Sequence, residues 1–238
     1  MNSCKNLSFN MNILLTAIGS MSALCAINNL HKAGHKVIGC DIYPKEWHYE
    51  ASQCDVFKQA PYANTEEYIP FLLKLAKEND VKYLFPLTDL EIDVINPKRE
   101  LFEQEGITVC ISSKETLKIA RNKYSLFKTF KDDKTVPSVP TYTLEDDLTK
   151  LKYPCVAKPR DGRSSEGLCY LQNENQLNEI KHISSYIFQE KIEGSVCTVD
   201  YVRDPLTGSS FCVPREELLR TKNGAGTTVR IFHNAKLE

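Results

Sequence analysis

One lysine stands where a short apolar run meets a segment rich in glycine and serine. The run 155–157 is Cys-Val-Ala, and Lys158 follows it directly. The small residues of the next segment are Gly162, Ser164, Ser165 and Gly167. Small residues leave backbone N–H groups free to close over phosphate oxygens, and a lysine ammonium adds a point positive charge. The pattern predicts a strand that delivers Lys158 to a phosphate-binding loop, with a surface hairpin and a solvated lysine as the alternative.

Composition limits the class of protein. The 238 residues are enough for one large domain or two small ones, and 42% hydrophobic and 26% charged residues are ordinary for a globular chain. A net charge of −1 gives no support for a nucleic acid or an acidic membrane as partner. No apolar run approaches the length of a membrane span. We therefore expect no nucleic-acid and no membrane partner.

The cysteines and the N-terminal residues indicate a compartment. The nine cysteines are odd in number, show no C-x-x-C spacing and mostly lie in apolar runs, as small buried hydrophobes do in a reducing environment. A catalytic or metal-binding cysteine is the minority alternative. Residues 1–10 have no hydrophobic core and no cleavage site, so we expect a loose leader rather than a secretory signal. Together these features predict a cytoplasmic protein.

Alternating strand and helix patterns run from residue 11 to residue 111. The expected strands are 12–16, 37–41, 83–85 and 107–110, and the expected helices are 23–32, 66–78 and a helical region that ends at 105. This order predicts a parallel sheet with right-handed crossovers, of about four strands. The class is α/β, and ligands of such open sheets bind beyond the carboxyl ends of the strands.

A dinucleotide cofactor is the obvious ligand for such a sheet, and the first turn disfavours it. The turn after strand 12–16 carries only Gly19, where a dinucleotide fingerprint has three glycines. Side chains in place of the other two keep the backbone away from a pyrophosphate. We interpret Asp41, at the end of the second strand, as a residue that holds a loop. An NAD-dependent oxidoreductase is therefore a disfavoured alternative.

From residue 112 the pattern changes to α+β. Residues 112–115 read as a capping box with Ser112 as N-cap, and a helical apolar stripe follows through residue 130. Residues 131–140 form a polar, proline-containing connector. The later expected elements are strands 168–171, 186–189, 197–202, 211–213 and 227–231, and a helix at 175–182. Lys123 lies beside the apolar stripe rather than on it.

Three motifs in this order resemble the ATP-grasp superfamily. They are Asn122-Lys123-Tyr124, Lys158 with its glycine–serine loop, and the strand-end segment 189–194, Gln-Glu-Lys-Ile-Glu-Gly. The likeness is strongest to the branch typified by the large subunit of carbamoyl-phosphate synthase, and residues 84–91, Leu-Phe-Pro-Leu-Thr-Asp-Leu-Glu, are similar to a segment typical of that branch. It implies an open parallel-sheet pre-ATP-grasp domain at 11–111. A partial α+β ATP-grasp domain at 112–238 would then hold the nucleotide-binding lobe and the start of the second lobe.

The resemblance assigns roles to single residues. Lys123 and Lys158 would contact nucleotide phosphates, and the loop 162–167 would close over the triphosphate and exclude water. Glu190 would accept a hydrogen bond from the adenine amino group. The other residues expected beside the adenine ring are Gln189, Lys191 and Ile192. As alternatives, Lys123 and Glu190 are solvated surface charges.

Two features depart from the family pattern. The family usually holds the ribose hydroxyls with a glutamate at a position that is here Val196 or Cys197, and Glu193 replaces it only if the backbone shifts. The Mg²⁺ ligands of the family lie downstream of the strand that ends near Val213, and the sequence shows no such carboxylate cluster before Glu238. We therefore expect no metal site in this chain, and an ATP-grasp domain that lacks its C-terminal part.

The function implied by the resemblance is an ATP-dependent carboxylate–amine (or ammonia) ligase that acts through an acyl phosphate. It would use ATP, Mg²⁺ and an unknown carboxylate or amine substrate. Arg215, and with less support Arg220, would contact phosphate or substrate, with pairing to nearby acids as the alternative. We expect little turnover from this chain alone. The competing hypothesis is a non-catalytic nucleotide-binding or assembly module, as a homodimer or with a partner chain.

Overall fold

Two units divide the chain, Met1–Lys114 and Glu115–Glu238. The computed structural model describes residues 10–204, 206–221, 224 and 226–235. All but the last residue of the predicted leader, and most of the segment 222–226, lie outside the described residues. The first unit contains a parallel sheet and the second contains antiparallel sheets, so the predicted α/β class with a parallel-sheet domain followed by an α+β domain is confirmed.

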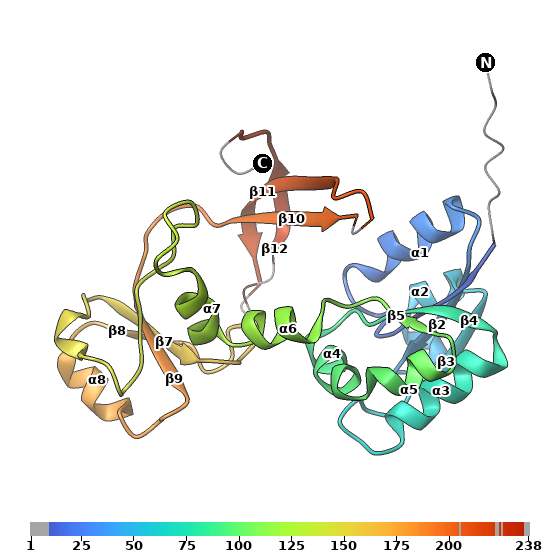
Figure 1. Ribbon diagram of the computed structural model, residues 1–238, viewed down its shortest axis with the longest axis horizontal. Helices are drawn as coiled ribbons and strands as arrows, with labels where there is room; N and C mark the ends of the chain where they lie inside the picture. The colour runs from blue at the N-terminus through green and yellow to red at the C-terminus, as the bar shows by residue number, and fades with distance from the viewer. Residues whose placement is uncertain (1–9, 205, 222–223, 225, 236–238) are drawn as a thin grey trace. The chain divides into compact units, whose positions relative to one another are not determined.

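The first unit is a five-stranded parallel sheet of strand order β3-β2-β1-β4-β5 (Figure 1). Its strands are β1 (Asn12–Leu15), β2 (Lys36–Asp41), β3 (Val56–Gln59), β4 (Val81–Phe85) and β5 (Thr108–Val109). Its helices are α1 (Ala23–Lys32), η1 (Lys45–Trp47), α2 (Tyr49–Gln53), α3 (Tyr68–Glu78), α4 (Asp89–Ile95), η2 (Asn96–Lys98) and α5 (Arg99–Gln104). Because β1 lies between β2 and β4, the chain reverses its direction of travel across the sheet at this point.

Alternation along β1 builds two cores, one on each face of the sheet. Leu14 faces a cluster that includes Leu72 of α3 and Phe102 of α5. Ile13 faces the opposite cluster, which includes Ile27 of α1. Successive side chains of a strand point to opposite faces, so a strand buried on both sides reads as a continuous apolar run. The predicted run at 12–16 has this character for that reason.

Two elements of the first unit were not predicted. The edge strand β3 adds a fifth strand where about four were expected, and α2 precedes it. Strand β3 reads Val-Phe-Lys-Gln, with two half-buried residues followed by two exposed ones. An edge strand is paired and packed on one side only, so it leaves a weak pattern in the sequence. The helix expected to begin at Glu66 begins at Tyr68.

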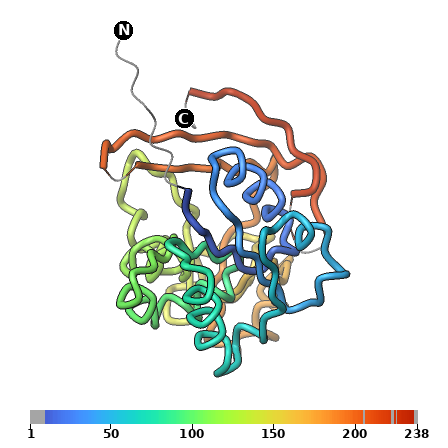
Figure 2. Tube along the Cα trace, turned by 90° about the vertical axis from the view of Figure 1, so that its right-hand side faces the viewer, coloured from blue at the N-terminus to red at the C-terminus, as the bar shows by residue number. Residues whose placement is uncertain are grey.

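The second unit contains two antiparallel sheets, of order β6-β9-β7-β8 and β10-β11-β12. The strands are β6 (Thr141–Tyr142), β7 (Cys155–Pro159), β8 (Cys169–Leu171), β9 (Tyr186–Glu190), β10 (Cys197–Arg203), β11 (Ser210–Arg220) and β12 (Gly226–Ile231). The helices are α6 (Lys114–Ala120), which begins at the last residue of the first unit, α7 (Lys123–Phe130), η3 (Leu148–Lys150) and α8 (Glu174–Ile180). Figure 2 shows β10, β11 and β12 as long neighbouring segments.

The apolar stripe of residues 117–130 is divided between two helices, whereas a single helix was expected. Helix α6 ends at Ala120, and Asn122 has extended backbone angles and caps α7 by accepting hydrogen bonds from the N–H groups of Tyr124 and Ser125. An asparagine side chain competes with the backbone for such bonds and therefore favours a helix start. Helix α6 begins at Lys114, so the predicted N-cap at Ser112 is wrong by one position.

The four-stranded sheet has its own core. Cys155, Ala157 and Phe188 are buried against Leu177 of α8. Strand β7 pairs with β9 through the register Pro159↔Tyr186, one residue beyond the expected stop at Lys158. Its pairing with β8 ends earlier, at Ala157. Strand β7 therefore has a neighbouring strand on both sides up to Ala157, whereas Lys158 pairs with β9 alone.

Candidate active site

Lys123 and Lys158 line one cavity of about 150 Å³. Lys158 comes from β7, and Lys123 is the first residue of α7. The rest of the lining comes from the end of β7 and the loop after it, with the residues Pro159, Gly162, Arg163, Ser164, Ser165, Glu166 and Leu168. The two lysines and the glycine–serine loop that the sequence singled out are thus brought together.

Lys123 is held in this cavity through both its backbone and its side chain. Its N–H donates to the carbonyl of Arg160 at 2.8 Å, and its Nζ donates to the carbonyl of Gly162 at 2.6 Å. Asn122 fixes the first turn of the helix that carries it. These bonds anchor the loop directly to the start of α7, so the alternative of a solvated surface lysine does not apply to Lys123.

The cavity disfavours the charged form of Lys158. Burial, and then the nearby charge of Lys123, lower the pKa of Lys158. Both effects act in the same direction, because a buried ammonium loses hydration and a second ammonium repels it. An anion placed between the two amines would reverse the second effect. Electrostatics therefore favour an anionic ligand in this cavity.

The loop after β7 has a strained backbone. Ser164 and Ser165 adopt left-handed angles, with φ of 50° and 56°, and Gly167 has φ of 68°. Such angles are uncommon for residues other than glycine and cluster at binding sites. Gly167 accepts a hydrogen bond from the hydroxyl of Tyr186, and a Cβ at Gly167 would lie 2.7 Å from that oxygen. Glycine is required at this position by both its backbone and its neighbour.

The segment expected beside adenine ends β9 and does not contribute to the described lining of the lysine cavity. Gln189 donates from its amide to the hydroxyl of Thr141 at 2.8 Å. Glu190 lies 3.7 Å from Lys152, and its side chain is 49% exposed. The N–H of Lys191 donates to the carbonyl of Pro154 at 2.9 Å. That N–H is occupied, so a ring edge at this segment would contact the carbonyl of Lys191 or the backbone of Ile192.

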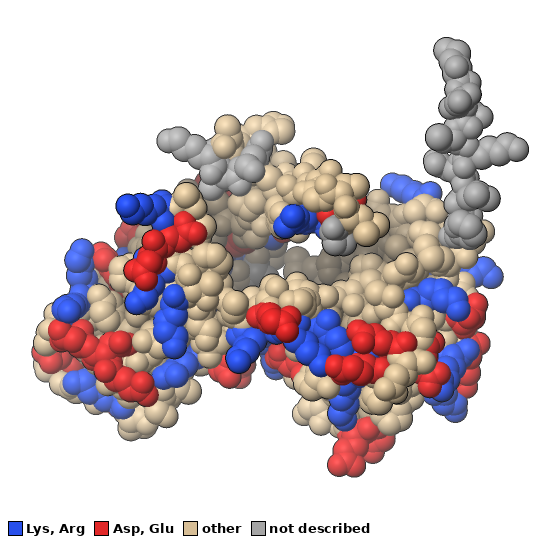
Figure 3. Space-filling view, viewed as in Figure 1, with Lys and Arg blue, Asp and Glu red and all other residues tan. Residues whose placement is uncertain are grey.

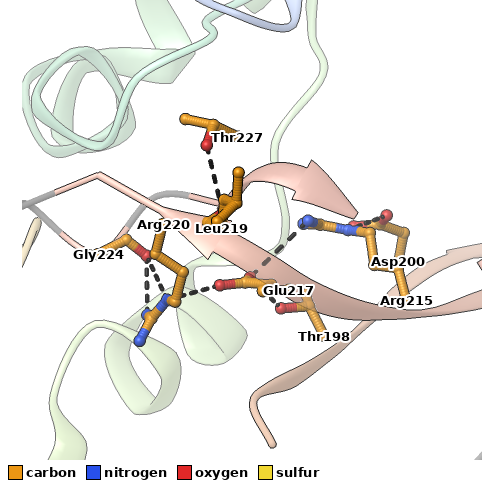
Figure 4. A network of polar contacts seen from close by, with 8 residues as sticks. All are labelled: Thr198, Asp200, Arg215, Glu217, Leu219, Arg220, Gly224 and Thr227. Atoms are coloured by element: carbon orange, nitrogen blue, oxygen red, sulfur yellow. Dashed lines mark hydrogen bonds and ion pairs between the residues drawn. The ribbon is translucent and has the colours of Figure 1, made fainter. Parts of the chain in front are cut away.

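Arg215 and Arg220 belong to one network of polar contacts on β10 and β11 (Figure 4). Arg215 donates to Asp200 at 2.8 Å, and Arg220 lies 2.8 Å from Glu217. Glu217 also accepts from the hydroxyl of Thr198. The structure thus pairs both arginines with acids, which was the alternative for them. Glu217 was not predicted as a site residue, although alternation on β11 places it on the same face as Arg215.

The described residues contain no group of three or more histidine, cysteine, aspartate or glutamate side chains that could hold a metal ion. Glu193, the conceivable replacement for the ribose-binding glutamate, pairs with Lys191 at 2.5 Å. The oxygen donors that Mg²⁺ prefers are therefore not gathered in this part of the chain. Arg163 is a further cationic residue of the cavity that the sequence analysis did not single out.

At the carboxyl edge of the parallel sheet, Asp41, the residue interpreted as holding a loop, accepts hydrogen bonds from loop N–H groups. Asp41 is buried and accepts from the N–H of Gly19 at 2.9 Å. His48 lies 3.3 Å from Asp41, and a Cβ at Gly19 would lie 2.5 Å from the ring of His48. The backbone at Gly19 is thus occupied by protein groups, which further disfavours a pyrophosphate at this turn.

Charges of both signs lie together on the face drawn in Figure 3, where lysine and arginine side chains alternate with aspartate and glutamate side chains. Among the described helices, none is both long enough and apolar enough to cross a membrane.

Two protein families match parts of the chain. The family described as ATP-grasp domain matches residues 120–237, and the family described as PylC-like, N-terminal domain matches residues 13–110. The D-alanine–D-alanine ligase of Petrotoga mobilis is 30% identical over 108 residues, 43% of this chain and 36% of that protein. The chain thus covers only about a third of the length of that relative.

Solved structures support the same fold. The biotin carboxylase domain of the 2-oxoglutarate carboxylase of Hydrogenobacter thermophilus matches with a TM-score of 0.69 and 16% identity, over 90% of this chain and 51% of that chain. The L-amino acid ligase of Bacillus licheniformis matches with a TM-score of 0.63 and 14% identity, over 87% and 53%. The chain spans about half the length of these proteins, and at such identities the likeness concerns the fold alone.

Proposed function

We propose, because the chain belongs to the ATP-grasp superfamily, that it binds ATP with the phosphates in the cavity of Lys123 and Lys158. The observation that carries the proposal is the meeting of these two ammonium groups under one glycine–serine loop. A cavity of about 150 Å³ suits phosphoryl groups rather than a whole nucleotide. The adenosine would lie outside it, with the ring against the segment Gln189–Ile192 and Glu190 at the amino group.

The reaction that we propose for the whole protein is ligation of a carboxylate to an amine or ammonia through an acyl phosphate. The named activities of the Petrotoga and Bacillus relatives support the ligase class. In such a reaction the carboxylate attacks the terminal phosphorus, ADP leaves, and the amine then displaces phosphate from the acyl carbon. Lys123 and Lys158 would hold the triphosphate and offset the charge that develops on it.

Magnesium is expected for this chemistry, and the Hydrogenobacter structure was solved with MgADP. When bound, Mg²⁺ would neutralise phosphate charge. The described side chains do not form a cluster that fits the ion. We therefore assign no metal ligand to these residues, and we expect little turnover from this chain alone.

We also propose that the protein is cytoplasmic. The eight described cysteines all have free thiols, which supports a reducing compartment. A homodimer or a second chain is part of the same proposal, since the Hydrogenobacter domain is described as a dimer. The alternative function is a non-catalytic nucleotide-binding or assembly module. The likeness to the carbamoyl-phosphate synthase branch, the domain boundary after residue 111 and the substrate roles of Arg215 and Arg220 stay predictions.

Calorimetric titration with ATP tests the proposal. Replacing Lys158 with Met keeps the stem and removes the charge, and we expect ATP affinity to fall about 10- to 150-fold, because a hydrogen bond to a charged group contributes roughly 1.5–3 kcal/mol. Lys118→Met, at an exposed position on α6, is the matched control. Equal affinities of the two variants would contradict the phosphate site. Release of ADP in the presence of amino acids would favour the ligase over the non-catalytic module.

A further inference from the structure

Gly224 lies close to the loop that covers the lysine cavity. It has a left-handed φ of 82°, and a Cβ built on it would lie 2.8 Å from Oγ of Ser165. Ser165 lines the cavity from the loop. Cβ atoms essentially never approach another atom so closely, so a side chain at position 224 would force the Ser165 hydroxyl to move. The loop is thus approached by a residue that lies outside the four-stranded sheet carrying Lys158.

Arg220 holds Gly224 in place. Its Nε and a terminal nitrogen both donate to the carbonyl of Gly224, at 3.1 and 2.7 Å. Its Nε also lies 2.8 Å from Oε2 of Glu217. The planar guanidinium can serve a carbonyl and a carboxylate at once, a geometry that a lysine ammonium does not reproduce. Figure 4 shows Arg220 with its contacts to Gly224 and Glu217.

Glu217 is the fixed point of the network. Its side chain is 8% exposed, and it accepts from the Thr198 hydroxyl at 2.8 Å. The hydrogen bond from Thr198, together with Arg220 and Arg215, lowers the pKa of Glu217. The carboxylate is therefore charged at neutral pH, and it ties the end of β11 to β10. Because Arg220 contacts both Glu217 and Gly224, it connects Gly224 to this fixed carboxylate.

We propose that Gly224 is a latch on the phosphate loop, with Arg220 as its positioning residue. The latch is the close approach of Gly224 to Ser165, maintained by the hydrogen bonds from Arg220 to Gly224 and by the ion pair of Arg220 with Glu217. It rests on the proposed function in that the loop it holds is the one assigned to the triphosphate. Arg220 is not among the described lining residues of the cavity. It acts on the ligand site through Gly224 and the loop.

The other contacts of the loop explain why a latch matters. Lys123 donates to Gly162 at one end of the loop, and Tyr186 donates to Gly167 at the other end. Between these two anchors, Ser164 and Ser165 adopt strained left-handed backbone angles. If the loop were not held, we expect both residues to relax out of these angles. The contact at Ser165 supports the middle of this strained stretch. Without the latch, we expect the middle of the loop to open while both ends stay attached.

Trypsin digestion tests the latch without any nucleotide, because Arg163 offers a cleavage site directly before Ser164. In the variant Gly224→Ala, we expect cleavage after Arg163 to accelerate about five-fold or more, since a Cβ at this position overpacks the contact. The matched control is Gly208→Ala. Gly208 has a φ of 73° in the turn between β10 and β11, and its Cβ would meet nothing closer than 3.8 Å. We expect this control to leave the rate within about two-fold of the native protein.

A double variant separates the contact from general loosening. With Ser165→Gly as background, Gly224→Ala should no longer accelerate cleavage, because the oxygen that the new Cβ meets has been removed. Arg220→Lys should resemble Gly224→Ala. Equal acceleration by Gly224→Ala and Gly208→Ala, or an unchanged effect of Gly224→Ala in the Ser165→Gly background, would overturn the latch. Neither outcome depends on ATP binding, so it would leave the proposed function standing, and a failure of ATP binding would leave the latch testable.

Discussion

The cap of α7 gives a direct test of how Lys123 is positioned. Asn122 accepts two hydrogen bonds, from Tyr124 N at 3.1 Å and from Ser125 N at 2.9 Å, and Lys123 follows it as the first helical residue. Replacing Asn122 with Ala removes both bonds. We expect a loss of helix stability of about 1 kcal/mol, within a usual range of roughly 0.5–2 kcal/mol.

The same loss of helix stability limits the expected change in ATP affinity. If Lys123 contacts phosphate only when the first turn of α7 is formed, the apparent affinity falls with the population of that turn. A change of about 1 kcal/mol corresponds to a factor of roughly five. We therefore expect Asn122→Ala to raise the Kd for ATP by no more than about five-fold, less than the direct loss of an ammonium–phosphate contact.

The control is a second asparagine cap in the same unit. Asn173 caps α8 by accepting from Gln176 N at 3.2 Å, and α8 contributes no residue to the described lining of the cavity. Hydrogen exchange should show faster opening of α7 in Asn122→Ala and of α8 in Asn173→Ala. Calorimetry should show weaker ATP binding only in Asn122→Ala. If the Kd rises equally in both variants, or rises far more than five-fold in Asn122→Ala, this account of how Lys123 is positioned is refuted.

Two further predictions concern charge. Because burial and Lys123 lower the pKa of Lys158, its positive charge is present below that lowered value and is lost as pH rises through it, so ATP affinity measured by titration should begin to fall at a lower pH than for an ordinary lysine. In Lys123→Met the decline should move to higher pH, and an unmoved decline would assign it to another group. In the first unit, Glu91→Gln should lower the free energy of unfolding by about 1–3 kcal/mol, because the buried carboxylate accepts from the hydroxyl of Tyr68 at 2.6 Å and from Thr88, and an amide cannot accept at both positions. Urea unfolding measures this loss, and the exposed Glu103→Gln should leave stability unchanged.

Arg215 and Arg220, the two basic residues of β11, make different contacts. Arg215 pairs with Asp200, a neighbour across β10 and β11, and with Glu217 at 3.8 Å. Arg220 also pairs with Glu217 and in addition reaches Gly224. Ion pairs of exposed residues contribute little to stability. Their role here is geometric, because Arg215 lies between two acids and Arg220 links Glu217 to Gly224.

Local patterns determined much of this protein. The helix at Ala23–Lys32 has the predicted bounds, because its apolar residues recur with the period of a helix and Gly34 follows it. The strands at 37–41 and 186–189 were each recognised to within a residue at either end, since a buried strand is marked by a continuous apolar run. The glycine–serine loop and the lysine before it were equally visible. Such features depend only on neighbours in sequence.

Tertiary structure decided the rest. That Lys123 and Lys158 share a cavity follows from the packing of α7 beside the end of β7, and no spacing in the sequence encodes it. Whether the N–H of Lys191 is free depends on Pro154, which reaches it only because β7 and β9 are adjacent. The contact of Gly224 with Ser165 likewise joins segments that are distant in the chain. Sequence periodicity reports which face of an element is buried, whereas the partner on that face is chosen by the packing of the whole unit.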